Sequence, residues 1–187
     1  SDLAAWTAPP EAPAEDLGRW PVSAWWPRAL RLARLGTLAK SETEIVEAAV
    51  RAVAEADAIL APAGLGVGYR TRDEIALFCL HAAETPEAFR TREGDPVDPL
   101  DLALMLRLLP RIEGAGAAIR SAVLRLFAWA SGESPESDER DARSRLEAWD
   151  RGGRPAVLPG SRFPRTAARL ALIVEGIVED GVASYWA

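Results

Sequence analysis

The sequence has few of the residues that most often carry covalent or metal chemistry. Its 187 residues include one cysteine, Cys79, and one histidine, His81. A lone cysteine cannot form a disulfide within the chain, which fits a reducing compartment. A catalytic triad would have to use His81, whose apolar surroundings beside Leu80 favour a packed side chain instead. Zinc binding by Cys79 and His81 is excluded, because residues two apart in a helix point to different faces.

Long apolar runs, a basic leader and a positive net charge are also lacking. No stretch approaches the roughly 18 apolar residues of a membrane helix, and no basic segment precedes an apolar one at the start. The formal net charge of −6 disfavours general binding to nucleic acid or to a membrane surface. We therefore expect a cytoplasmic protein without a direct nucleic-acid partner. Because the chain opens with Ser1 rather than Met, we expect it to be a piece of a longer protein.

Two near-matches to nucleotide-binding loops fail. The segment Gly36–Ser41 resembles the end of a phosphate loop, but that loop needs a glycine directly before the lysine, where this chain has Ala39. The glycines within 64–68 follow a predicted helix rather than a strand, and Tyr69 stands where a dinucleotide fingerprint needs its third glycine. No tight acidic cluster suggests Mg²⁺ ligation. The sequence therefore predicts no catalytic residue and no metal ligand.

The residues that are abundant favour helices. Hydrophobic residues make up 49% of the chain, Ala and Leu dominate, and their spacing is helical, which predicts an all-α bundle of about six to seven helices. Residues 1–27 hold four tryptophans and five prolines and are expected to form an extended arm. Residues 131–161 are interpreted as a surface insertion, and Val182–Trp186 is compatible with a short terminal strand. The expected helices cover about 28–39, 41–60, 68–83, 99–109, 116–130, 139–149 and 164–178.

Local signals place several helix starts. Thr71 with Glu74, and Ser41 with Glu44, have the spacing of a capping box. Asp98 followed by proline is a further start signal. The mixed charges of 139–147 are typical of a solvated helix face. The helix after Asp98 is expected to bury a stripe formed by Leu102, Met105, Leu106 and Leu109.

The most informative stretch is the helix start after the glycine-rich turn. It carries two arginines, Arg70 and Arg72, where a helix N-terminus also points its amide donors outward. Arginine makes bidentate contacts with phosphate, so this edge favours a bound anion. Gly66, Gly68 and Tyr69 would form the turn next to it. The alternative is that both arginines merely pair with nearby carboxylates.

Four segments, taken in order, resemble the C-terminal part of McrB-type AAA+ NTPases: Gly68–Ile75, Asp101–Gly114, Phe163–Leu170 and Asp180–Trp186. That family has a glycine-tyrosine-arginine helix start, a leucine-leucine-proline-arginine-isoleucine block and an aspartate-glycine tail that closes on an aromatic residue. The resemblance covers roughly residues 60 to 187. Within the tail, residues 182 and 183 are valine and alanine where the family has an aromatic residue and a threonine.

The resemblance implies an AAA+ lid and C-terminal extension, residues 28–187, following a nucleotide-binding core that lies outside this sequence. In the restriction branch of the family such motors hydrolyse GTP. The implied cofactors are a nucleoside triphosphate and Mg²⁺, which the lid does not hold alone. The implied partners are the core of the same or a neighbouring subunit, further copies in a homo-oligomeric ring, and a McrC-type nuclease. Arg70, or failing it Arg72, would reach the terminal phosphate.

A second interpretation stays open. The chain lacks the family's phosphate loop, its acidic Mg²⁺ motif and its asparagine-containing signature, so it would not hydrolyse a nucleotide unaided. It could instead be a free-standing, non-enzymatic helical adaptor that binds a protein through its tryptophan-rich arm, residues 1–27.

Overall fold

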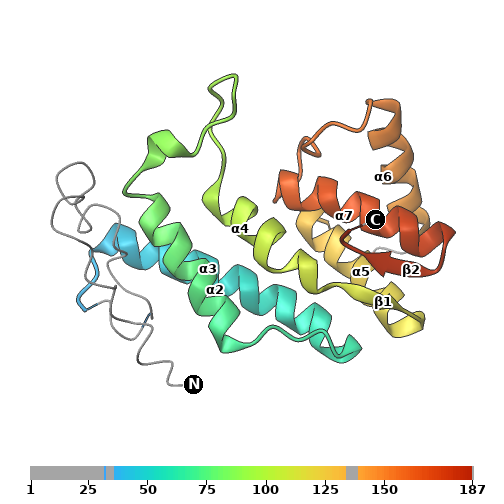
Figure 1. The fold of residues 1–187 in the computed structure, drawn as a ribbon, viewed down its shortest axis with the longest axis horizontal. Helices are drawn as coiled ribbons and strands as arrows, with labels where there is room; N and C mark the ends of the chain where they lie inside the picture. The colour runs from blue at the N-terminus through green and yellow to red at the C-terminus, as the bar shows by residue number, and fades with distance from the viewer. Residues whose placement is uncertain (1–31, 33–35, 134–138, 187) are drawn as a thin grey trace, which may run out of the picture.

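The computed structural model of the chain describes residues 32, 36–133 and 139–186. Within them, six α-helices and a two-stranded antiparallel sheet confirm the predicted helical bundle and its terminal strand (Figure 1). Three single 3₁₀ turns, η3 (Ala61–Ala63), η4 (Pro86–Ala88) and η5 (Leu109–Arg111), lie between the helices. The helices and strands are α2 (Lys40–Leu60), α3 (Tyr69–Ala82), α4 (Pro99–Arg107), β1 (Glu113–Ala115), α5 (Ala117–Ser131), α6 (Glu139–Arg151), α7 (Pro164–Glu179) and β2 (Val182–Ser184).

The expected arm of residues 1–27 lies outside the described residues, as does most of the helix expected over 28–39. Residues 36–39 are described and are not helical, so that predicted helix does not extend to Ala39. No helix of the described residues combines the length and the apolar character needed to cross a membrane.

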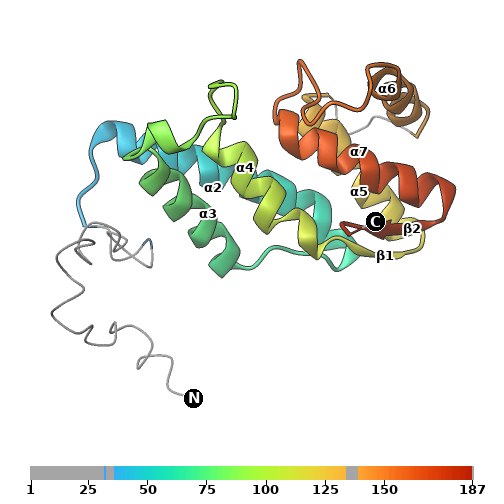
Figure 2. The same cartoon turned by 45° about the horizontal axis from the view of Figure 1, so that its top comes forward.

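The helices form two groups in space. α2, α3 and α4 lie together on one side, and α5, α6 and α7 with the small sheet lie on the other (Figures 1 and 2). α4 packs against α7, and α2 packs against α5, so the two groups share one apolar core. The largest fully buried side chains come from both groups and include Phe127, Leu60, Ile75, Leu104, Leu126 and Leu170.

Both predicted capping boxes are wrong. α3 begins at Tyr69 with Gly68 in extended geometry before it, so Thr71 lies inside the helix rather than at its cap. α2 begins at Lys40, and the Glu42 carboxylate accepts the backbone N–H of Ala39 at 2.7 Å. The predicted box at Ser41 and Glu44 therefore lies two residues too late in the sequence. At α2 the contact is made by Glu42, two positions before the predicted Glu44. At α3 no side chain caps the helix, and Thr71 and Glu74 instead accept hydrogen bonds from Arg111 and Arg107.

The start of α4 is as predicted, but its buried face is different. Asp98 caps the helix by accepting the N–H of Leu100 at 2.9 Å, and the proline after Asp98 takes the first helical position. Leu106, expected in the core, is 48% exposed. Because α4 packs against α3 on one side and α7 on the other, its buried arc shifts to Asp101, Ala103, Leu104 and Leu108.

The first turn of α7 is capped from a different helix. Asp101 of α4 is only 2% exposed, and its two carboxylate oxygens accept the backbone N–H groups of Arg165 at 2.8 Å and Thr166 at 2.9 Å. The hydroxyl of Thr166 donates in return to the backbone carbonyl of Asp101 at 3.0 Å. A carboxylate at a helix N-terminus satisfies otherwise unpaired donors and interacts favourably with the helix dipole. Asp101 therefore fixes how α4 and α7 meet.

The terminal strand β2 finds a partner that was not predicted. β1 pairs with it in antiparallel register, with Gly114 opposite Ala183. Gly114 has φ +130°, and a Cβ there would come within 2.7 Å of the Ile119 side chain, so glycine suits this position. As predicted, Gly181, at φ +74°, ends α7. The sheet thereby ties the chain's last residues to the segment between η5 and α5.

α6 lies over α5 and α7 (Figure 1). It buries Ala142 and Trp149. The loop after it is joined to the core, because Leu158 donates its N–H to the Pro164 carbonyl at 2.8 Å and Phe163 donates to the Ala130 carbonyl at 2.9 Å. The interpretation of 131–161 as an insertion stays a prediction.

Candidate functional site

The predicted nucleotide-proximal residues lie together at the start of α3. Gly66 and Gly68 are in the turn after η3, and Tyr69 is the first residue of the helix. Tyr69 is 80% exposed, and the side chain of Arg70 is 88% exposed. The structure therefore presents this edge at the surface rather than burying it in the core.

The two predicted arginines differ in how they are held. Arg70 donates from Nε to Glu74 Oε1 at 2.9 Å, which uses one of its five N–H donors. Arg72 donates from Nε and Nη2 to Asp73 Oδ1 at 2.8 and 2.6 Å. Its guanidinium also lies 5.0 Å from the ring centroid of Tyr69. Both arginines thus pair with carboxylates, as the alternative held, but Arg70 keeps far more of its surface open to an incoming anion.

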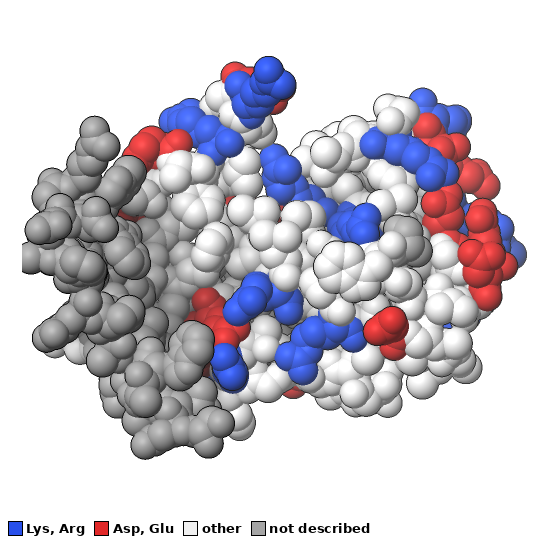
Figure 3. Space-filling model, in the orientation of Figure 1, with Lys and Arg blue, Asp and Glu red and all other residues white. Residues whose placement is uncertain are grey.

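Two further arginines reach this edge from the neighbouring segments. Arg107, the last residue of α4, pairs with Glu74 Oε2. Arg111, in η5, donates from Nη1 to the Thr71 hydroxyl at 2.9 Å and from Nη2 to the Gly66 carbonyl at 3.4 Å. Figure 3 shows basic side chains gathered over the start of α3 and the end of α4. Sequence reasoning missed Arg107 and Arg111, although their spacing of four residues within one block was a usable signal.

The turn itself is firmly anchored. The backbone N–H of Val67 donates to Asp57 Oδ1 of α2 at 2.6 Å, and a Cβ on Gly66 would sit 3.4 Å from the same oxygen. Arg111 holds the Gly66 carbonyl from the other side. The turn is thus fixed between α2 and η5, and it sets the position from which Tyr69 and Arg70 project.

The electrostatics of this edge favour an anion. We define the arginine edge as Arg70, Arg72, Arg107 and Arg111 with the two carboxylates of Asp73 and Glu74; its formal charge is +2 in a chain of −6. Burial acts to raise the pKa of Glu74, but the Arg70 hydrogen bond and the Arg107 charge outweigh it and lower that pKa. Glu74 is therefore a carboxylate at neutral pH, and a positive excess remains around it.

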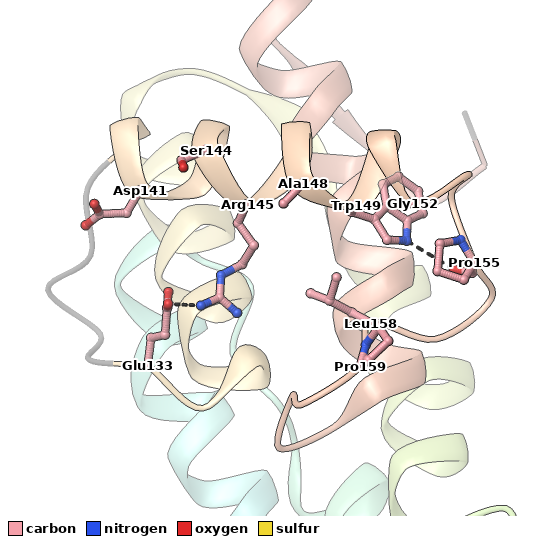
Figure 4. Close-up of a pocket in the computed structure, with 10 residues that line it drawn as sticks. All are labelled: Glu133, Asp141, Ser144, Arg145, Ala148, Trp149, Gly152, Pro155, Leu158 and Pro159. Atoms are coloured by element: carbon pink, nitrogen blue, oxygen red, sulfur yellow. Dashed lines mark hydrogen bonds and ion pairs between the residues drawn. The ribbon is translucent and has the colours of Figure 1, made fainter.

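A separate cleft lies beside α6, with a volume of about 810 Å³. Figure 4 shows Arg145 pointing from α6 into this cleft, where it pairs with Glu133, while Leu158 and Pro159 form the opposite wall. Burial lowers the pKa of the Arg145 guanidinium, yet the group stays cationic at neutral pH. The charges of α6 were expected to be solvated, and Arg145 departs from that expectation. None of the residues predicted for the site lines this cleft.

Neither Cys79 nor His81 belongs to the arginine edge. Cys79 is buried, and burial together with the Asp98 charge raises the pKa of its thiol to about 12, so the reactive thiolate is scarce. The Nε2 atom of His81 is buried and has no hydrogen-bond partner among the described residues. Across the same part of the chain, no group of three or more His, Cys, Asp or Glu side chains is arranged to hold a metal ion.

Fold and site together define a helical module with an exposed arginine edge. The chain belongs to the family described as domain of unknown function DUF8727, whose family model matches residues 28–182. The matched segment covers every described helix and leaves out residues 1–27. No curated protein and no solved structure matches the chain.

Proposed function

We propose that the chain is the helical lid and assembly module of a McrB-like AAA+ NTPase, working in a cytoplasmic motor of the restriction or defence type. The observation that carries this proposal is the placement of Arg70. It stands at the start of a well-anchored helix, with its side chain 88% exposed and four of its five N–H donors outside the contact with Glu74. This is what an arginine needs if it is to reach a phosphate presented by another domain.

The contacts between the resemblance segments support the same proposal. Arg111, in the segment 101–114, donates to Thr71 in the segment 68–75. Asp101, also in 101–114, caps the helix that begins in the segment 163–170 by accepting the N–H of Thr166. β1 pairs with β2 in the fourth. The residues that carry the resemblance are therefore joined into one framework around α4.

The mechanism we propose is closure of the lid on a nucleotide held by the core. Transfer of the terminal phosphoryl group spreads negative charge over its oxygens, and a positioned arginine stabilises that charge. Arg70 would supply this contact, and the anchored turn of 64–68 would hold the start of α3, and so the backbone of Arg70, in place. The nucleoside triphosphate and Mg²⁺ would belong to the core, with GTP or ATP as the substrate. A homo-oligomeric ring and a McrC-type nuclease would be the partners.

Replacing Arg70 with alanine is expected to lower nucleotide hydrolysis by about a hundredfold in the intact protein that contains the core, because one charge-stabilising arginine is lost. Phosphate release with GTP and with ATP is the measurement. Arg92→Ala is the matched control, since Arg92 is an exposed arginine in the loop between α3 and α4. Unchanged hydrolysis and ring assembly in Arg70→Ala, or an equal loss in Arg92→Ala, would eliminate the proposed role.

A further inference from the structure

The carboxylate of Glu74 holds two arginines at once. Its Oε1 accepts from Arg70 at 2.9 Å, four residues earlier on the same helix. Its Oε2 pairs with Arg107 at the end of α4. Arg70 and Arg107 are thereby brought to the two oxygens of one anionic group, although they come from different helices. Two guanidinium groups around one pair of oxygens form the arrangement that a phosphate also satisfies.

A second contact joins α3 to the segment that follows α4. Thr71 lies three residues before Glu74 on α3, and Arg111 lies four residues after Arg107, so each pair shares a helix face or its continuation. Arg111 donates to the Thr71 hydroxyl at 2.9 Å. Two side-chain contacts therefore join α3 to α4 and η5, one between Arg107 and Glu74 and one between Arg111 and Thr71. These contacts fix where the guanidinium of Arg107 sits relative to Arg70.

We infer that Arg107 is a second phosphate-binding arginine and that Glu74 is a built-in competitor, which occupies the Arg70–Arg107 pair until a terminal phosphate displaces it. The inference rests on the proposed function for its ligand, the terminal phosphate of a nucleoside triphosphate. Arg107 can reach such a ligand because its side chain is 56% exposed, whereas that of Glu74 is 32% exposed. Both guanidinium groups are therefore more accessible to a ligand than the carboxylate that they share.

Displacement is favoured by charge and involves no covalent step. A terminal phosphate carries more negative charge than one carboxylate and offers three oxygens to the two guanidinium forks. Glu74 needs no new partner when it is displaced, because an exposed edge lets water solvate the freed carboxylate. The arginines exchange one anionic partner for a stronger one, so the closed state forms only when the phosphate is present.

The inference is tested by binding inorganic triphosphate to the full 187-residue chain, measured by isothermal titration calorimetry at low salt. Arg107→Gln and Arg70→Gln are each expected to weaken binding about tenfold, since each removes a charge-assisted contact. Glu74→Gln is expected to tighten binding about fivefold, because the competing negative charge is gone and a neutral amide holds the two arginines less strongly. Arg92→Gln, an exposed arginine outside the edge, is expected to leave the affinity unchanged.

Three results would overturn the inference: unchanged affinity in Arg107→Gln, weaker or unchanged affinity in Glu74→Gln, and no binding by either the unaltered chain or Glu74→Gln. Circular dichroism melting of each variant checks that the fold is intact. The outcome separates from that of the proposed function. Turnover lost in Arg70→Ala with triphosphate affinity unaffected in Arg107→Gln defeats only the inference. Normal turnover in Arg70→Ala with the expected affinity pattern defeats only the proposed function.

Discussion

Replacing Asp101 with alanine is expected to lower the free energy of unfolding by about 4 kcal/mol, because two charge-assisted hydrogen bonds are lost, one of them from a buried backbone donor and one from a part-buried donor. The N–H groups of Arg165 and Thr166 both donate to the Asp101 carboxylate. At 2% exposure this residue leaves little room for water to replace the lost oxygens. The effect should therefore exceed that of an ordinary exposed helix cap.

Urea unfolding followed by circular dichroism measures this effect, provided that the slope of free energy against denaturant stays the same. Asp98→Ala is the matched control, because Asp98 is also an aspartate that caps a helix, accepting one N–H at an exposed position. Its loss is expected to cost about 1 kcal/mol. A cost for Asp101→Ala no greater than that for Asp98→Ala would contradict the account of how α4 and α7 are joined.

Replacing Trp129 with alanine is expected to cost a similar amount, about 4 kcal/mol, through loss of packing. Trp129 is 7% exposed, and its ring centroid lies 4.9 Å from that of Phe163. Its Nε1 donates to Glu55 Oε2 of α2 at 2.8 Å, and the same oxygen accepts from Arg162 at 2.6 Å. The indole thus connects α5 with α2 and with the loop before α7.

The conservative change separates the two contributions of this side chain. Trp129→Phe keeps an aromatic ring and loses the hydrogen bond to Glu55, so it is expected to cost about 1.5 kcal/mol. Trp186→Ala is the control, because Trp186 is 76% exposed and its removal should change stability by less than about 0.5 kcal/mol. Should Trp129→Phe prove as damaging as Trp129→Ala, the hydrogen bond rather than the packing would be the main contribution.

Local signals in the sequence were sufficient for much of the fold. The apolar spacing of α5 and α7, the Asp98 cap and the Gly181 stop depend on residues a few positions apart, and the structure confirms them. The predicted caps of α2 and α3, Ser41 and Thr71, lie two and three residues after the observed caps, Ala39 and Gly68. In α3, Thr71 and Glu74 both lie inside the helix, and their side chains bind Arg111 and Arg107 from outside it.

Features that depend on distant partners could not be predicted in this way. β1 consists of glutamate, glycine and alanine, none of which favours a strand, and it is a strand only because β2 lies beside it. The candidate site shows the same limit. Arg70 and Arg72 follow from one short motif, whereas Arg107 joins them through a contact across 33 residues of sequence. The orientation of the Arg145 side chain toward the cleft likewise involves Glu133, which lies outside α6.

The most direct test of the central claim is to ask whether the start of α3 comes next to a terminal phosphate. The intact protein would carry Tyr69→Cys in a Cys79→Ala background and be offered a nucleoside triphosphate with a thiol-reactive group on its last phosphate. Arg92→Cys in the same background is the control. We predict covalent labelling at Tyr69→Cys and not at Arg92→Cys. Equal labelling of the two, or none at Tyr69→Cys while the protein still hydrolyses nucleotide, would contradict the claim.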